Sequence, residues 1–294
     1  MNDFSKNLPE ACYAFQNMSF ADAQSAYYAD ETVVGIVSEI DSLKKEIHVK
    51  LGNNLIGYMT YDETTIYPLT TRAQHNRPLL VPIQIWTLIG KKICAKILSI
   101  DNEKIMLSRK NCMLEAYEVI RHNEKLPFYV TAATKRNLFG DVGFGIQAKI
   151  HIRELCKTKL YSVEDLFNLG EMFYVKVIGF DELNRANVSY RATFPPYNPA
   201  EYRVGDVFKA TINTPVDSVK SGFFTSISPQ VVGIMDYNRL MPEINYGDKV
   251  EVVVHKITPL GLHLRFLKKL TWNKISSNKM FEDILFIYIL YIYF

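Results

Sequence analysis

The sequence predicts an all-β protein made of three tandem five-stranded Greek-key barrels with short connecting helices. Two observations support this class. Apolar residues alternate with polar ones at period two in many short segments, such as AKIHIREL at 148–155 and VEVVVHKI at 250–257, which is typical of half-buried strands. The same ordered series of strand signals also recurs three times within the 294 residues, a length that suits two domains or three small ones.

The first of these series follows an N-terminal extension, residues 1–30, in which we expect a short helix. Repeat one covers residues 31–110. Its strand signals are ETVVGIVSEI, HVKLGNNLIGYM, IGKKICAKILSID and KIMLSRK. The apolar spacing in NCMLEAYEVIRH then predicts a helix, so residues 111–125 form a linker helix to the next repeat.

Repeat two covers residues 126–195. Its strand signals are FYVTAAT, FGDVGFGIQAKIHI, LGEMFYVKVIGFD and ANVSYRA. A short helix is expected at 163–169, because Ser162 and Asp165 have the spacing of a capping box and Gly170 stands at the C-cap position.

Repeat three covers residues 202–267 and contains DVFKATI, FFTSISPQVVGIM, YGDKVEVVVHKIT and GLHLRFL. Each repeat enters its third strand through a small residue: Gly57, Ala148 and Gly233. Residues 268–294 form an apolar C-terminal tail. Its uninterrupted apolar run at 284–294 is short of the roughly 18 to 20 residues that span a bilayer, so no membrane partner is expected.

A unit of about 70 residues with five short strands matches the size and pattern of the OB-fold. In this fold the second and third strands commonly present an oligonucleotide-binding surface. Three such units in series therefore favour a binding protein.

Composition excludes other classes. The 34 Lys and Arg residues against 31 Asp and Glu give a net charge of +3, too small to prove a polyanionic partner. The 4 cysteines are scattered and form no Cys-x-x-Cys pair, so neither a disulfide framework nor a metal site is expected. With no secretory signal at the N-terminus, we expect a cytoplasmic protein.

The repeats resemble those of the ribosomal protein S-one family. The resemblance rests on Ile100 and Asp101 with IMLSRK at 105–110, on AKIHIREL and the VKVIGFDELNRANVSY hairpin, and on GDVFKATI at 205–212. It covers residues 31–267 and implies OB-fold repeats that bind RNA. Repeat three departs from the pattern, because it lacks the family's His and the Leu-Ser ending.

The resemblance implies an RNA-binding face made of an aromatic residue, a His, an Asp and a basic residue. In repeat two these positions fall on Phe139, His151, Asp181 and Arg185, with Lys149 as a further cation for the phosphates. Repeat one offers His48, Thr60, Asp101 and Lys104, with Tyr58 nearby. Repeat three has Phe224 at the aromatic position but Asp236 in place of His and Thr258 in place of Asp, which argues against RNA binding there.

These positions have simpler readings that the sequence leaves open. Phe139 would also fit the core of its strand, and His151, between two isoleucines, would also fit as an ordinary solvated residue. Asp181 and Arg185 bracket a turn and would also form a surface ion pair.

No enzyme is predicted. GFGIQA at 143–148 has the spacing of a dinucleotide fingerprint, but a strand rather than a helix follows it, so no helix N-terminus is available for a pyrophosphate. No nucleophile elbow or zinc-protease motif occurs, so we expect no catalytic residues, no cofactor and no small-molecule substrate.

We therefore predict a cytoplasmic protein that resembles a short form of ribosomal protein S-one. It is expected to bind single-stranded RNA and to act in translation. The resemblance implies messenger RNA and the small ribosomal subunit as partners, or a transcript held for turnover. The alternative is an interaction module whose barrels dock on a ribosome or an RNA-processing complex with little RNA contact. A third reading, in which the apolar tail holds the barrels at a membrane, also stays open.

Overall fold

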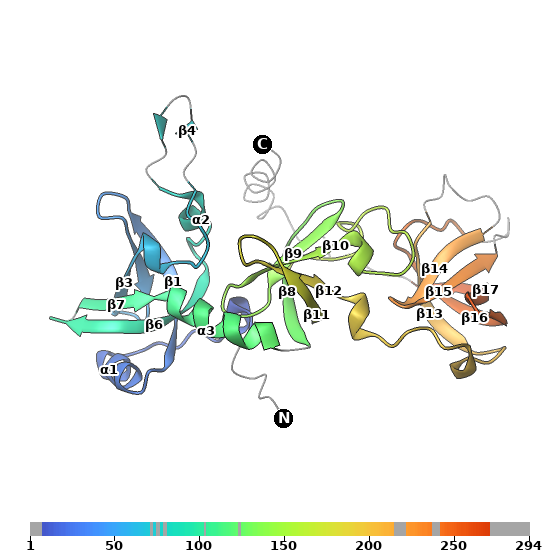
Figure 1. The fold of residues 1–294 in the computed structure, drawn as a ribbon, viewed down its shortest axis with the longest axis horizontal. Coiled ribbons are helices and arrows are strands. Elements are labelled where there is room, and N and C mark those ends of the chain that lie inside the picture. The colour runs from blue at the N-terminus through green and yellow to red at the C-terminus, as the bar shows by residue number, and fades with distance from the viewer. Residues whose placement is uncertain are drawn as a thin grey trace.

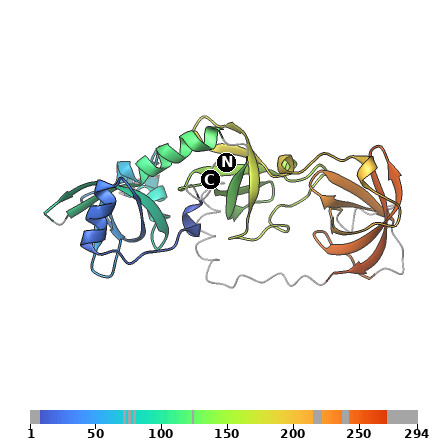
Figure 2. The ribbon, with the colours of Figure 1, turned by 90° about the horizontal axis from the view of Figure 1, so that it is seen from below.

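The computed structural model describes residues 8–270 except 71–72, 75–76, 79–80, 103, 123–124, 215–221 and 237–241. Three closed five-stranded barrels follow one another along the chain and lie in a row (Figures 1 and 2). The predicted fold class is therefore confirmed. The apolar run at 284–294 lies outside the described residues.

The three barrels, numbered one to three after the repeats, share one topology, in which the third strand pairs in parallel with the fifth. In barrel one the strands are β1 (Thr32–Asp41), β2 (Glu46–Lys50), β3 (Ile56–Thr60), β6 (Lys92–Asp101) and β7 (Lys104–Ser108). In barrel two they are β8 (Leu126–Ala133), β9 (Asn137–Asp141), β10 (Gln147–His151), β11 (Met172–Phe180) and β12 (Ala186–Ser189). In barrel three they are β13 (Val207–Ile212), β14 (Gly222–Ser228), β15 (Val231–Asp236), β16 (Lys249–Thr258) and β17 (Gly261–Lys269).

Short helices and a small hairpin complete the chain. The α-helices are α1 (Phe20–Tyr28), α2 (Ile83–Trp86) and α3 (Arg109–His122). The 3₁₀ turns are η2 (Glu10–Cys12), η3 (Tyr61–Glu63), η4 (Ile152–Glu154), η5 (Arg191–Thr193) and η6 (Pro199–Glu201), and β4 (Ala73–Gln74) pairs with β5 (Arg77–Pro78). Within the described residues, no helix is both long and apolar enough to cross a bilayer.

The small residues that open the third strands are required by the parallel pairing that closes each barrel. A Cβ on Gly57 would lie 2.4 Å from Leu107 Cδ1, and a Cβ on Gly233 would lie 2.4 Å from Leu264 Cδ1. Both leucines are fully buried in the barrel interior. The recurrence of a small residue at this position thus has a packing cause.

Helix α3 joins barrel one to barrel two and confirms the helix predicted within residues 111–122. Cys112, Met113, Ala116 and Ile120 recur at helical spacing and are buried in an apolar cluster that contains the core of barrel two and extends to Cys94 on β6 of barrel one. The helix is therefore packed against a barrel along one face.

The helix predicted at 163–169 is wrong. The segment contains a turn, in which the N–H groups of Leu166 and Phe167 both donate to the Val163 carbonyl. The hydroxyl of Ser162 is buried and makes no capping hydrogen bond. Gly170 does adopt the left-handed φ of +81° expected of a C-cap glycine. The Val163 N–H donates to the Lys135 carbonyl and the Gly170 N–H to the Val130 carbonyl, and these tertiary hydrogen bonds override the local helical signal.

Candidate nucleic-acid interface

The registers of the three barrels align one row of side chains across the second, third and fifth strands. A residue of the second strand pairs with one of the third, which pairs in turn with one of the fifth. The rows are His48, Tyr58 and Met106 in barrel one, Phe139, Lys149 and Asn187 in barrel two, and Phe224, Ile234 and His263 in barrel three. Of the residues singled out in the sequence, His48, Phe139 and Phe224 are thus structurally equivalent, as are Tyr58 and Lys149.

Phe139 lies on the outer face of barrel two. Its neighbours Leu138 and Gly140 are buried, whereas Phe139 itself is half-buried, as expected when successive side chains alternate across a sheet. The core reading of this residue is therefore wrong. Its cross-strand partner on β10 is Lys149, so the two side chains leave the same face of the sheet.

Lys149 and His151 point to the same side of β10, because they are two residues apart. Both line a pocket of about 520 Å³ whose floor is formed by Ile178, Gly179 and Phe180 of β11. His151 is exposed, and its Nδ1 accepts a hydrogen bond of 3.3 Å from the backbone N–H of Arg153. Among the described residues no carboxylate is within ion-pair distance of Lys149, so its charge is available to a ligand.

The acidic group in this pocket is already neutralised. Glu154 accepts two hydrogen bonds from the Arg191 guanidinium, at 3.2 Å from Nε and 3.0 Å from Nη2. Burial raises the pKa of Glu154, but hydrogen bonds from Ser189 and Arg191 outweigh it and leave the pKa lowered. The pocket therefore contains a carboxylate that is paired with Arg191 and a lysine that forms no ion pair with the described residues. The uncompensated positive charge of Lys149 favours binding of an anion.

Asp181 and Arg185 form the surface ion pair that the sequence left open. Arg185 Nε is 2.7 Å from Asp181 Oδ2, and Asp181 Oδ1 accepts the backbone N–H groups of Leu183 and Arg185. Partial burial raises the pKa of Asp181, but the hydrogen bonds from Arg185 outweigh it and hold the pKa below its usual range. Asp181 thus shapes the hairpin, and the Arg185 side chain that it pairs with is 45% exposed.

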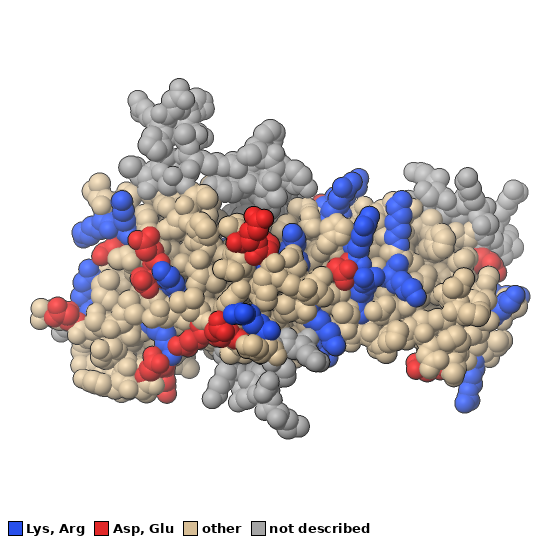
Figure 3. All heavy atoms as spheres, in the orientation of Figure 1, with Lys and Arg blue, Asp and Glu red and all other residues tan. Residues whose placement is uncertain are grey.

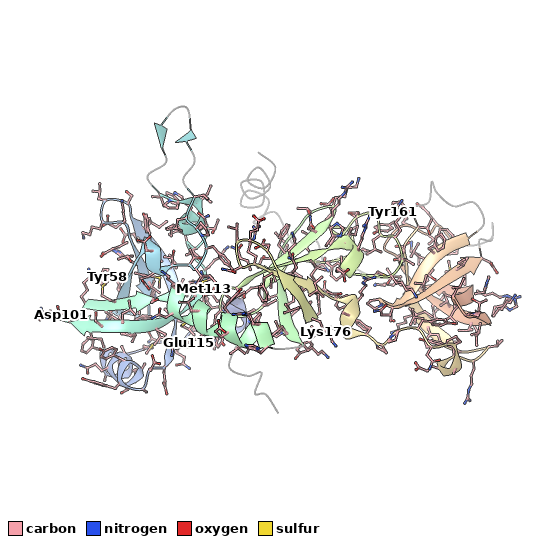
Figure 4. The ribbon with its side chains drawn as sticks, viewed as in Figure 1. Tyr58, Asp101, Met113, Glu115, Tyr161 and Lys176 are labelled. Atoms are coloured by element: carbon pink, nitrogen blue, oxygen red, sulfur yellow. The ribbon has the colours of Figure 1, made fainter. Side chains whose placement is uncertain are left out.

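In barrel one the structure brings three of the predicted residues together around Tyr58, which Figure 4 labels. The rings of His48 and Tyr58 meet edge to face at 5.0 Å, and Lys104 Nζ lies 5.0 Å from the centre of the Tyr58 ring. This cluster is more acidic than its equivalent in barrel two, because Glu39 lies 3.0 Å from His48 and Glu46 lies 3.4 Å from Lys104.

The other two predicted residues of barrel one are cross-strand partners of residues in or beside this cluster. Thr60 is half-buried and pairs with Glu46. Asp101 is exposed at the tip of the β6–β7 hairpin, beside Lys104 in the register and at the outer end of the barrel (Figure 4).

Barrel three presents an apolar pair in this row. Phe224 is 52% exposed and Ile234, its cross-strand partner, is 39% exposed. Asp236 is exposed and pairs with Gly222, one alternating position away from Phe224. Phe224 and Ile234 thus form an exposed aromatic platform on barrel three. Asp236 lies toward one end of this platform.

Sequence reasoning missed Asn187. It is half-buried on β12 between the buried Ala186 and Val188, pairs with Lys149 and lines the same pocket. The alternation in ANVS would have placed it on the outer face. Across the residues that the structure describes, no group of three or more His, Cys, Asp or Glu side chains is arranged to hold a metal.

No protein-family model matches the chain. Among curated proteins, the small ribosomal subunit protein bS1 of Staphylococcus saprophyticus is 27% identical over 165 residues, which cover 51% of this chain and 41% of that protein. The bS1 protein of Staphylococcus aureus is 30% identical over 114 residues, which cover 36% of this chain and 29% of that protein. The matched region thus spans less than half the length of these relatives.

Solved structures were matched as well. A multidomain protein with nucleic acid binding domains from Streptococcus pneumoniae aligns over 89% of this chain and 80% of its own, with 13% identity and a TM-score of 0.28. GSP13 from Bacillus subtilis aligns over 27% of this chain and 62% of its own, with 22% identity and a TM-score of 0.23. The sequence matches to bS1 confirm the resemblance of the repeats to the S-one family, and these relatives are ribosomal proteins rather than enzymes.

Proposed function

We propose that this S-one-like repeat protein binds single-stranded RNA, with messenger RNA as the natural ligand, and acts in translation at the small ribosomal subunit. The observation that carries the proposal is the row on barrel two, where an outward aromatic ring, an unpaired lysine and an amide lie side by side above a pocket. The bS1 relatives, which are proteins of the small ribosomal subunit, support the setting.

The row, together with His151 and Arg185 of the same barrel, suits the two chemical parts of a nucleotide. Phe139 and His151 offer flat faces for bases, and stacking of one base on an aromatic ring contributes about 1–3 kcal/mol whatever the base. Lys149 and the exposed guanidinium of Arg185 offer cations for the phosphates. Asn187 adds an amide that can donate and accept hydrogen bonds.

A duplex does not suit such a surface. In a double helix the bases are stacked on each other, so their faces are not available to Phe139 or His151. The row therefore favours an unpaired strand, whose bases are free to splay onto protein side chains.

The test is fluorescence anisotropy of labelled single-stranded RNA, single-stranded DNA and duplex RNA, titrated with the whole chain at several salt concentrations. We expect single-stranded RNA to bind at micromolar concentration or tighter and much more tightly than duplex RNA. The logarithm of the association constant is expected to fall linearly with that of salt, with a slope of about −0.7 for each phosphate contacted.

The double variant Phe139→Ala, His151→Ala tests the site itself. Loss of the two stacking faces is expected to weaken binding by at least about 5-fold for each. The control is Tyr28→Ala, which removes an aromatic side chain that is 84% exposed on α1. Equal affinity of the double variant and the wild type would remove barrel two from the site. Binding to none of the three nucleic acids would instead favour the interaction module that docks on a protein.

A further inference from the structure

The segment between β10 and β11 lies against barrel three. The Lys157 N–H donates to the Pro229 carbonyl at 2.8 Å, and Asn213 Nδ2 donates to Thr158 Oγ1 at 2.7 Å. The hydroxyl of Tyr246 accepts the N–H groups of Tyr161 and Ser162, at 3.0 and 3.1 Å, and donates to the Ser162 carbonyl at 2.8 Å. These bonds fix a stretch of repeat two on the surface of barrel three.

This contact places repeat two beside the aromatic platform of barrel three. Asn213, which holds Thr158, also donates its backbone N–H to the Phe224 carbonyl at 2.8 Å and its Nδ2 to Ser226 Oγ at 3.0 Å. Ser226 and Phe224 are two residues apart on β14 and share its outer face. Asp236 pairs with Gly222, on the opposite side of Phe224 along the strand. Thr158 therefore reaches the platform from the end away from its acidic residue.

Two lysines flank Thr158. Lys157 and Lys159 are exposed, and no Asp or Glu of the described chain lies within ion-pair distance of either. Figure 3 shows Lys and Arg side chains gathered over barrel two and its junction with barrel three, with few acidic ones among them. The surface around Lys157 and Lys159 is thus basic although the chain as a whole is nearly neutral.

A second exposed ring completes the group. Tyr161 is 37% exposed at the junction (Figure 4). The rings of Tyr161 and Tyr246 meet edge to face at 6.1 Å between their centres, and Lys159 Nζ lies 5.1 Å from the centre of the Tyr161 ring. A ring held in place by a hydrogen-bonded backbone and accompanied by a cation is preorganised for a base and its phosphate.

We propose that Lys157, Lys159 and Tyr161 form a junction site that carries a single RNA strand from the face of barrel two to Phe224 of barrel three. This inference rests on the proposed function and goes beyond it, because it assigns RNA contact to a segment outside the barrel faces and gives barrel three a role in binding. In the junction site a base stacks on Tyr161, the two lysines hold flanking phosphates, and the next bases reach Phe224.

The experiment compares the wild type with the triple variant Lys157→Ala, Lys159→Ala, Tyr161→Ala, using single-stranded RNA of about 6 and about 20 nucleotides. One OB-fold covers about 4 to 16 nucleotides, so only the longer RNA extends from one barrel to the next. The variant is expected to bind the long RNA at least about 5-fold more weakly, with a salt slope shallower by about 1.4, and to bind the short RNA as the wild type does. In the wild type, photocrosslinking to bromouridine-substituted long RNA is expected at Tyr161.

The matched control is Lys125→Ala, Tyr174→Ala. Lys125 Nζ lies 4.9 Å from the Tyr174 ring centre, the same kind of pair on a different part of barrel two. This variant is expected to retain the affinity of the wild type for both RNAs. Unchanged binding of long RNA by the triple variant, or equal weakening for both lengths, would overturn the junction site while the proposed function stands. Failure of the wild type to bind any single-stranded RNA would overturn both.

Discussion

At the scale of single residues, a buried charge cluster holds barrels one and two together. Glu10 receives two hydrogen bonds from the Arg109 guanidinium, at 2.7 and 2.8 Å, and the Glu10 N–H donates to Asp141 Oδ2 at 2.8 Å. Glu10 precedes barrel one, Arg109 begins α3 and Asp141 ends β9 of barrel two. The Arg109 cation thus hydrogen-bonds to Glu10 and interacts electrostatically with Asp141. Burial together with the Glu10 charge raises the pKa of Asp141 to about 7.

Removal of Arg109 is expected to be costly and dependent on pH. Arg109→Ala leaves two buried carboxylates without a cation, which typically costs about 3–5 kcal/mol. The folded-state pKa of Asp141 is above its ordinary value of 3.8. The contribution of Asp141 to the free energy of unfolding therefore falls as pH rises from about 4 to about 7. The loss in Arg109→Ala is therefore expected to be larger at pH 8 than at pH 5, where Asp141 is protonated.

Urea unfolding of wild type and variant at the two pH values measures this. Arg121→Ala is the control, since Arg121 forms an exposed pair with Glu118 on the same helix and its removal is expected to cost under about 1 kcal/mol. A loss in Arg109→Ala that did not depend on pH would contradict the role given to Asp141.

At the scale of elements, a glycine on β9 sets which side of the strand faces out. A Cβ on Gly140 would lie 2.4 Å from the Tyr129 carbonyl oxygen and 2.6 Å from the ring of Phe128, which is fully buried. Only glycine fits here without movement of the backbone. Because Gly140 faces inward, its neighbour Phe139 faces outward, and the candidate site depends on this choice.

Gly140→Ala is therefore expected to strain the β8–β9 pairing. We expect a loss of about 1–3 kcal/mol in the free energy of unfolding, as for other additions of volume to a packed core. Thermal unfolding followed by circular dichroism measures it, with Thr131→Ala at an exposed position of β8 as the control. If the two variants were equally stable, the close approach at Gly140 would not be a constraint.

At the scale of the whole molecule, barrel two is held at both ends. The cluster of Glu10, Arg109 and Asp141 fixes it to barrel one, and Tyr246 with the 157–162 segment fixes it to barrel three. The Gln230 side chain adds a hydrogen bond of 3.1 Å to the Arg191 carbonyl across the second junction. A fixed order of barrels lowers the entropic cost of engaging one RNA strand at several sites.

Tyr246→Phe removes the hydroxyl that makes three of the bonds across the second junction. We expect barrel three to tumble independently of barrel two, because the N–H groups of Tyr161 and Ser162 lose their acceptor. Nitrogen-15 relaxation measures this as different correlation times for the two barrels, and long RNA is expected to bind more weakly. Tyr197→Phe is the control, since the Tyr197 hydroxyl donates to Thr258 within barrel three. Identical correlation times in wild type and Tyr246→Phe would contradict the role of this hydroxyl.

The sequence by itself determined the fold class, the order of the repeats and the helix after repeat one, because period-two and period-3.6 patterns reflect local backbone geometry. It also placed equivalent positions in the three repeats, since the strand order recurs. It failed at 163–169, where the residue spacing of a capping box is present but backbone hydrogen bonds to Lys135 and Val130 hold the segment in another conformation. The alternation of apolar and polar residues predicted which face of its strand each side chain occupies. It did not predict which residues that side chain contacts.

Only the tertiary structure decided which residues distant in sequence contact each other. Asp181 and Arg185 are close in sequence and their pairing was foreseeable, whereas the meeting of Glu10 with Asp141, or of Thr158 with Asn213, joins residues 131 and 55 positions apart. Such contacts depend on how whole barrels dock, and docking is set by shape and buried polar groups that no local period encodes. The proposed junction site illustrates this: Thr158, which the two lysines flank, is joined through Asn213 to the strand of Phe224 only because barrels two and three dock on each other.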